Sequence, residues 1–593
     1  MKNIFKYIII GGICLGMASC EKDFIDLEPT GSFQDNVYFK TPSDFKAFSA
    51  GLYGQLQGWS FGNMDNNTDL SANIKGENSD LGHGTIDVNS SGWKNQYEGV
   101  RSCNILLSRS DFYTGDGDIS TYVGEAYFFR AYNYFNLLKS FGGVPIITTV
   151  LDVNSPELYG PRNSRYEVVN LILEDLDKAI SRLPIEQNIA SNDKGKISKW
   201  AAMAFKAQVE LYEATWEKYN GQDLDGDGVT VGGGTAAYDA SNRDKYLADV
   251  IASCEEIMNN GGYELWNKDS DATMGNKSMW YLFNLEDSGS NPGGYDKSTN
   301  KEFILYSVYD FVYRKSNINI TWTVGQHFPS RKFVDMPVCT DGLPADKSPL
   351  FQGYHAASDE FKNRDLRLLN YLYASNTVTG VPTLEFGTLG FSGYSNSKYA
   401  VYGYGTRRLD NTESANWSII RLAEVYLMYA EAIYELNGSI TDAQLNASIN
   451  KLRDRAGVAH LTNALVTANG LNMKEEIRRE RAVELYREGK RFDDLKRWGI
   501  LEESLNPSRL GRVVGDASYI TSYKDVNGNA TSSYKPQSYV FGEEAVATPA
   551  GVLKCVVIDS KNNHSVVRKH YLYPIPTSQI RLNSKLLQNP GYN

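Results

Sequence analysis

The sequence is poor in the residues that build disulfide scaffolds and zinc centres. Only 6 cysteines and 6 histidines occur among its 593 residues. Cys103, Cys254, Cys339 and Cys555 lie far apart, and no CxxC or zinc-ligand spacing connects them. A chain of this length can bury a core that needs no disulfide framework. We therefore expect these cysteines to be buried free thiols.

The chain also lacks an excess of positive charge. The formal net charge is −11, whereas a nucleic-acid partner requires a basic surface, so nucleic acid is excluded as a partner. Beyond the N-terminus, no apolar run approaches the roughly 20 residues that span a bilayer.

Known catalytic patterns are absent as well. The sequence contains no HExxH, no GxSxG, no Walker loop and no Cys–His nucleophile pattern. This favours a binding protein without enzymatic activity. A glycoside hydrolase, which needs paired carboxylates in a cleft, stays open as an alternative.

The N-terminus carries a short apolar run. Lys2 and Lys6 are followed by the apolar residues 7–17 and then by two small residues before Cys20. A basic start, a short apolar core and small residues predict an export signal over 1–19. Met-Ala-Ser-Cys resembles the lipobox of bacterial lipoproteins, which predicts lipid on Cys20, where several acyl chains anchor stably. The alternative is a plain signal peptide with a chance cysteine.

Helical periodicity covers much of the remaining chain. The expected helices are 41–57, with a possible cap at Ser43, and 93–107, 124–141, 164–184, 198–220, 246–259, 418–436, 442–455, 473–488 and 492–498. Helix pairs joined by short turns, without a strict repeat consensus, indicate a degenerate tetratricopeptide-like stack. The predicted fold is mostly α, a helical-repeat scaffold with a loop-rich irregular subdomain.

Changes in composition along the chain indicate how it is divided into parts. Residues 261–412 are rich in Gly, Asn, Ser, Tyr and Asp and show only short patterned runs. Loops of this kind usually carry the specific function. The expected parts are the signal 1–19, a tether 20–40, a helical region 41–260, a loop-rich ligand-binding insertion 261–412, and a helical region with a tail over 413–593.

Aromatic residues are abundant, with 39 Tyr, 24 Phe and 9 Trp. Tyr and Trp combine an apolar face with a polar edge, which suits stacking on sugar rings next to polar groups. Core packing is the alternative for each position. The candidate ligand contacts, chosen from loops and helix starts, are Trp59, Trp93, Asn95, Tyr97, Trp280, Tyr281 and Trp322.

One acidic stretch matches part of a calcium loop. Asp223, Asp225, Asp227 and Gly228 fit its first, third, fifth and sixth positions. The last ligand position holds Gly234 where a carboxylate is expected. The stretch is therefore a candidate calcium site, with a solvated acidic turn as the alternative.

Several sequence blocks together resemble the SusD/RagB family of outer-membrane nutrient-binding lipoproteins. The resemblance runs from the lipobox to the C-terminus. Its blocks are Gly124–Ile146, Ile419–Gly438, Ile449–Val458, Ile477–Gly499 and Tyr571–Tyr592. Charges on these largely apolar helices must be paired if they are buried. We expect interhelical ion pairs from Glu125, Arg130, Arg421, Glu424, Glu431, Arg478, Glu480, Arg481, Glu484, Glu488 and Arg491.

The resemblance implies binding without catalysis and without a required cofactor. Family members sit on the cell surface and deliver oligosaccharides to a SusC-like TonB-dependent outer-membrane transporter. Peptides are the ligands in RagB-like branches. A protein scaffold is a further alternative, because helical repeats often bind proteins.

Overall fold

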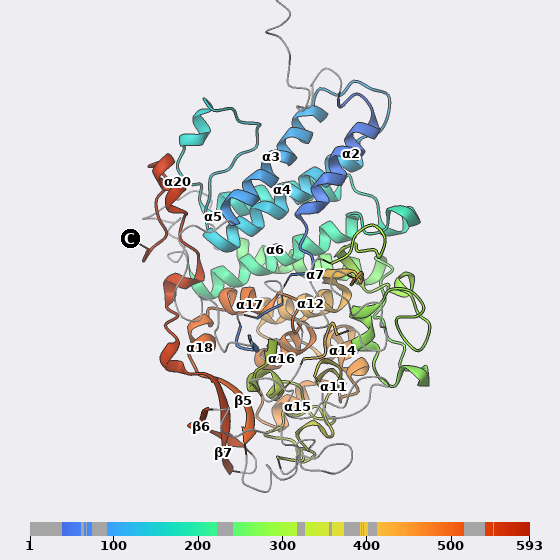
Figure 1. Ribbon diagram of the computed structural model, residues 1–593, viewed down its shortest axis with the longest axis vertical. Helices are drawn as coiled ribbons and strands as arrows, with labels where there is room; N and C mark the ends of the chain where they lie inside the picture. Colours follow the sequence, from blue (N-terminus) through green and yellow to red (C-terminus); the bar gives the residue numbers. More distant parts are fainter. Residues whose placement is uncertain are drawn as a thin grey trace, which may run out of the picture.

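The computed structural model describes residues 38–60, 64–66, 68–73, 92–221, 241–316, 327–354, 359–372, 392, 394, 396–400, 412–514, 540–548 and 551–592. Helices dominate these residues, and the strands are few. In Figure 1 the N-terminal helices occupy the upper half of the molecule and the C-terminal helices lie below them. The prediction of a mostly α, tetratricopeptide-like scaffold is confirmed.

The upper half is a stack of consecutive helices. Neighbours along the chain pack in pairs, α3 on α4, α4 on α5 and α6 on α7, and α7 also packs on the later α12. The contact between α7 and α12 joins the upper and lower halves. These helices are α2 (Pro42–Leu52), α3 (Gly92–Ser110), α4 (Ser120–Phe141), α5 (Arg165–Ile180), α6 (Lys199–Asn220), α7 (Ser241–Asn260) and α12 (Leu422–Asn437).

Local sequence signals define the helix ends. At the start of α2, the Thr41 hydroxyl accepts a hydrogen bond from the Asp44 amide, and the Asp44 carboxylate accepts one from the Thr41 amide. This capping box corrects the expected cap at Ser43. Helix α4 ends at Gly142, whose φ of 75° lies in a region that favours glycine. The predicted stop there is confirmed.

The lower half begins with a strand where a helix was predicted. Residues Trp417–Arg421 form β4, which pairs antiparallel with β2 (Phe303–Ser307) before α12 begins. The predicted helix start at Ser418 is therefore wrong. The remaining helices there are α13 (Asp442–Ala447), α14 (Ile449–Ala456), α15 (Asn463–Ala468), α16 (Met473–Glu484), α17 (Arg491–Arg497) and α18 (Leu501–Leu505).

Short elements fill the described part of the middle region. They are α8 (Ser278–Tyr281), α10 (Arg331–Asp335) and α11 (Leu366–Tyr371), with 3₁₀ turns between them. Strand β1 (Ser71–Asn73) pairs with β3 (His327–Pro329). The C-terminal sheet has the order β5 (Arg509–Val514), β7 (Gly551–Asp559), β6 (Val540–Thr548). The chain then returns to the upper half and ends near α20 (Thr577–Leu582) (Figure 1).

One hydrophobic core contains residues from both halves and from the middle region. The prediction of buried free thiols is confirmed for Cys103, Cys254, Cys339 and Cys555. Within the described ranges, no helix has the length and apolarity needed to cross a membrane.

Ion pairs join the helices as the sequence predicts. Arg130 on α4 meets Asp175 on α5 at 2.7 Å, and Arg481 on α16 meets Glu424 on α12 at 3.2 Å. Glu125 differs, because its carboxylate accepts a hydrogen bond of 2.6 Å from the Tyr53 hydroxyl. Further pairs between helices are Arg453–Glu480, Arg478–Glu435 and Arg497–Glu431. The predicted interhelical pairs of Arg421 and Arg491 are corrected: Arg421 lies on strand β4 and pairs with Glu484 and Glu488, and Arg491 pairs with Asp69 before β1.

Candidate functional site

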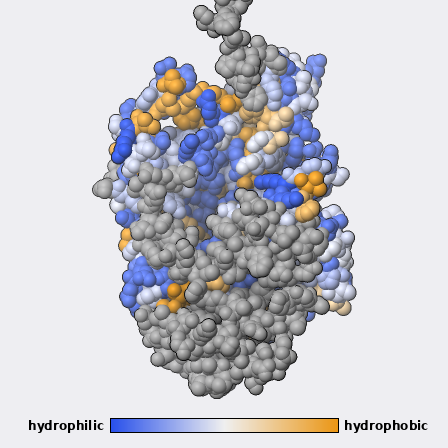
Figure 2. Space-filling view, in the orientation of Figure 1, coloured by the Kyte–Doolittle hydropathy of each residue, from blue (hydrophilic) through white to orange (hydrophobic). Residues whose placement is uncertain are grey.

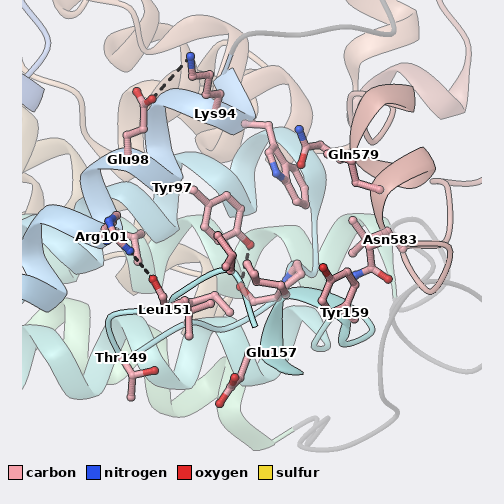
Figure 3. A pocket seen from close by; sticks show the side chains of 18 of the residues that line it. Lys94, Tyr97, Glu98, Arg101, Thr149, Leu151, Glu157, Tyr159, Gln579 and Asn583 are labelled. Atoms are coloured by element: carbon pink, nitrogen blue, oxygen red, sulfur yellow. Dashed lines mark hydrogen bonds and ion pairs between the residues drawn. The ribbon is translucent and has the colours of Figure 1, made fainter. Parts of the chain in front are cut away.

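A groove of about 820 Å³ lies between α3, the segment 145–159 and α20. We call it the α3–α20 groove (Figure 3). Its walls come from opposite ends of the chain, because α20 returns to the upper half after the C-terminal sheet. Helix α3 contributes Trp93, Lys94, Tyr97, Glu98, Val100 and Arg101.

Two of the predicted ligand aromatics meet in this groove. The ring centroids of Trp93 and Tyr97 lie 5.1 Å apart, and Trp93 also packs edge-on against Phe141. The Tyr97 hydroxyl donates a hydrogen bond of 2.7 Å to the Pro145 carbonyl. Burial raises the pKa of Tyr97 well above its ordinary value, so the hydroxyl stays protonated. These two rings form the floor of the groove.

Polar side chains surround this floor. Lys94 and Glu98 form an exposed ion pair of 3.7 Å along one turn of α3. Arg101 donates a hydrogen bond of 2.7 Å to the Leu151 carbonyl, which ties the segment 145–159 to α3 (Figure 3). Gln579 and Glu157 line other parts of the wall. Together they provide donors and acceptors of the kind that pair with hydroxyl groups.

The rim of the groove is apolar and exposed. The side chains of Val153, Tyr159 and Leu582 have exposed fractions of 81%, 52% and 72%. Figure 2 shows hydrophobic surface across the upper end of the molecule, over the segment 145–159. Tyr159 was not among the predicted contacts. Its place in a Leu-Tyr-Gly-Pro turn, between two helices, is the sequence signal that marks it as exposed.

Other predicted ligand aromatics lie in the interior. The Trp59 indole donates a hydrogen bond to the Ala415 carbonyl, and its ring meets Trp417 edge-on. The Trp280 indole donates to the Ser397 carbonyl, and Tyr281 beside it is buried. These rings are covered by neighbouring residues, so the structure assigns them to packing.

The remaining predicted positions divide into two groups. Asn95 is exposed on α3 and lies outside the groove lining. Cys20, Trp322 and the acidic residues Asp223, Asp225 and Asp227 lie outside the described residues. Among the residues that are described, no group of three or more His, Cys, Asp or Glu side chains comes together as a metal site.

Comparison with known proteins identifies the family. A model described as "SusD family" matches residues 291–592, which is half of the chain. The chain belongs to the SusD family. A second model, described as "Starch-binding associating with outer membrane", matches residues 55–211. The predicted SusD/RagB resemblance is confirmed, and the α3–α20 groove draws its walls from both matched stretches.

Relatives of this SusD-family chain match over most of their length. The SusD-like protein P38 of Formosa agariphila is 25% identical, and the match covers 85% of this chain and 93% of the relative. A SusD-like protein of Bacteroides ovatus is 23% identical, over 83% of this chain and 82% of the relative.

Solved SusD-like structures share the fold. One SusD-like protein of Bacteroides fragilis superposes with a TM-score of 0.67 at 23% identity, over 94% of this chain and 99% of that chain. Another structure from the same species, described as a SusD-like carbohydrate binding protein, gives a TM-score of 0.64 at 20% identity, over 92% and 99%.

Proposed function

We propose that this protein is a glycan-binding lipoprotein of the outer membrane that delivers its ligand to a SusC-like TonB-dependent transporter. Membership in the SusD family carries the proposal. The family model over 55–211 is described as starch-binding, and one solved relative is described as carbohydrate binding. No catalytic step is assigned to the protein.

The α3–α20 groove supports a glycan ligand by its chemistry. Tyr159 offers an exposed ring face for stacking on a sugar. Lys94, Glu98 and Gln579 line the same groove and offer polar groups of the kind that pair with sugar hydroxyls. An aromatic platform beside a few polar groups is the usual composition of a small-ligand site.

The proposal also includes a lipid anchor in the outer membrane. The lipobox at Cys20 supports a lipid anchor on the membrane surface, with residues 21–40 as the tether. The apolar rim at Val153 and Leu582 fits a protein neighbour, and this role is assigned to the transporter. The same rim favours a second candidate function, the binding of peptides with apolar side chains.

Isothermal titration of the full-length chain against a panel of neutral glycans, acidic glycans and peptides tests the proposal. We expect binding of at least one glycan and no release of reducing sugar during the titration. Binding of peptides alone would replace the glycan function with the peptide function. Release of reducing sugar would establish a hydrolase.

A further inference from the structure

Apolar side chains line most of the α3–α20 groove outside its aromatic floor. These residues include Ile147, Leu151, Val153, Leu158, Leu582 and Leu586. Three of them, Val153, Leu158 and Leu582, are exposed at the rim. An exposed apolar patch of this kind marks a surface that another group covers. With a volume of about 820 Å³, the groove has room for several apolar side chains of one peptide.

The expected N-terminal tether carries a short apolar stretch. Residues 24–27 read Phe-Ile-Asp-Leu, and they lie outside the described part of the chain. Three apolar side chains within four residues gain free energy when they leave water, and so does the groove that receives them. The stretch is therefore a candidate cover for the groove.

The tether is long enough to reach the groove. The described chain begins at Tyr38, shortly before α2, and the ring of Phe45 on α2 lies 5.3 Å from that of Tyr113, just after the C-terminal end of α3. Tyr97, in the floor of the groove, lies about 20 Å from this end of α3, at 1.5 Å per residue. The chain between residue 27 and Tyr38 spans up to about 36 Å when extended.

The charge of the α20 wall also suits the tether. Residues 577–593 contain no acidic side chain. Arg581 on α20 and Lys585 after it are exposed, and neither forms an ion pair within the described part of the chain. The tether, in contrast, has carboxylates at positions 23, 26 and 28. Because Asp152 and Glu157 lie on the opposite wall, we expect the carboxylates of the tether to face α20.

We propose that residues 24–27 dock in the α3–α20 groove when no ligand is bound, and that a ligand must displace them to enter. A segment of the same chain competes for the groove at an effective concentration on the order of millimolar. The proposal rests on the glycan-binding function only for the ligand that is displaced. The docking of the tether does not depend on what that ligand is.

Disulfide trapping tests where the tether lies. The chain begins at residue 20, the expected mature N-terminus, and carries Cys20→Ala; Cys103, Cys254, Cys339 and Cys555 are buried. With a mild added oxidant, Ile25→Cys combined with Leu582→Cys should crosslink about tenfold faster than Ile25→Cys combined with Phe112→Cys, because docking raises the local thiol concentration.

Phe112 is a stringent control position for this comparison. Its side chain is 77% exposed, and it lies next to Tyr113, near the start of the described chain. Random collisions of the tether would therefore favour the Phe112 pair over the Leu582 pair. A faster reaction at Leu582 requires a preferred position of the tether in the groove.

Serine substitutions test whether the apolar stretch holds the tether in place. Phe24→Ser should slow the crosslink to Leu582 about threefold or more, because it removes apolar area that docking buries. In chains without introduced cysteines, it should strengthen binding of a glycan that depends on Tyr159 about three- to tenfold, because apparent affinity scales with the fraction of open grooves. Phe33→Ser makes the same change outside residues 24–27 and should alter neither quantity.

Equal melting temperatures show that the variants are folded before they are compared. The proposal is overturned if the Phe112 pair crosslinks as fast as the Leu582 pair, or if Phe24→Ser behaves like Phe33→Ser; the groove is then left to a glycan or a protein neighbour. A selective crosslink in a chain that binds no glycan of the panel supports the docked tether and removes the glycan function. Glycan binding with an unselective crosslink retains the glycan function and removes the docked tether.

Discussion

Arg421 and Glu488 are joined by two parallel hydrogen bonds in the buried interior. The Arg421 Nε lies 2.8 Å from Glu488 Oε2, and Nη2 lies 2.7 Å from Oε1. The remaining Nη1 donates to Glu302 and Glu484, each at 2.7 Å. One guanidinium thus connects β4, the segment before β2, and the region around α16. The neighbouring carboxylates raise the pKa of Arg421, and the neighbouring cations hold the pKa of Glu488 below its usual range, although burial opposes both shifts.

Arg421→Ala should destabilise the protein by about 3–5 kcal/mol, because removal of one partner leaves buried carboxylates uncompensated. The free energy of unfolding from urea denaturation measures the loss. Lys178→Ala breaks an exposed pair with Glu174 on α5 and should change the free energy by less than about 0.5 kcal/mol.

The structural role of Arg421 leads to a second, independent prediction about ligand affinity. Any fraction of Arg421→Ala that folds should bind ligand with wild-type affinity, since Arg421 lies outside the lining of the α3–α20 groove. A stable variant that selectively lost binding would contradict a structural role for this ion pair.

Because of Glu210, the free energy of unfolding should fall as the pH rises. It lies buried on α6, where Lys206 is 3.8 Å away and its Oε2 has no hydrogen-bond partner among the described residues. Burial raises the pKa of Glu210 from 4.5 to about 8, with Asp249 adding repulsion and Lys206 opposing it. A raised carboxyl pKa means that the folded state holds a proton that the unfolded state has released. The stabilisation is complete below pH 4.5 and is lost as the pH rises through about 8.

Comparison with Glu210→Gln isolates this effect. Between pH 4.5 and 9 the wild-type free energy of unfolding should fall relative to the variant by about 3–5 kcal/mol, the scale set by the pKa shift. Asp65, whose pKa is raised to about 7 by burial, adds a similar decline to both proteins and cancels in the difference. Parallel curves for the two proteins would show that Glu210 is not protonated in the folded state.

The sequence was most informative where the signal was local. Amphipathic periodicity found the long helices, and Gly142 marked the end of α4 correctly. The strand β4 was missed because its apolar residues fit a helix equally well. Its identity depends on pairing with β2, which lies far away in the chain.

The same limit explains the mixed result for the aromatic candidates. Trp59 and Trp93 look alike in sequence, each next to a glycine and close to a loop. Trp59 is covered by Trp417 and Tyr399, which come from distant segments. Trp93 reaches the α3–α20 groove, whose far wall is α20. Neither environment is encoded near the tryptophan, so residue type alone could not separate the two.

Cys20→Ala should abolish palmitate labelling and release the protein from the outer-membrane fraction, because the thiol that we propose as the lipid acceptor is missing. Metabolic labelling followed by membrane fractionation measures both effects. Cys14→Ala is the matched control, since Cys14 lies in the expected signal segment and its loss should leave labelling intact. Continued labelling of Cys20→Ala would refute the anchor.

Tyr159→Ala should weaken glycan binding about three- to tenfold while the protein keeps its melting temperature. The residue is about half exposed and lies outside the hydrophobic core, so its removal leaves no cavity in the core. The expected loss corresponds to the usual contribution of an aromatic contact beyond simple burial. Titration with whichever glycan of the panel binds wild-type protein gives the comparison.

Tyr313→Ala is the matched control, because Tyr313 is 90% exposed and does not line the α3–α20 groove. It removes the same kind of ring from another exposed turn, so a general loss of aromatic surface would affect both variants equally. If Tyr159→Ala alone weakens binding, the glycan lies on the rim of the α3–α20 groove. If Tyr313→Ala alone weakens binding, the glycan lies instead on the turn after β2, and the α3–α20 groove is left as the contact surface for a protein neighbour.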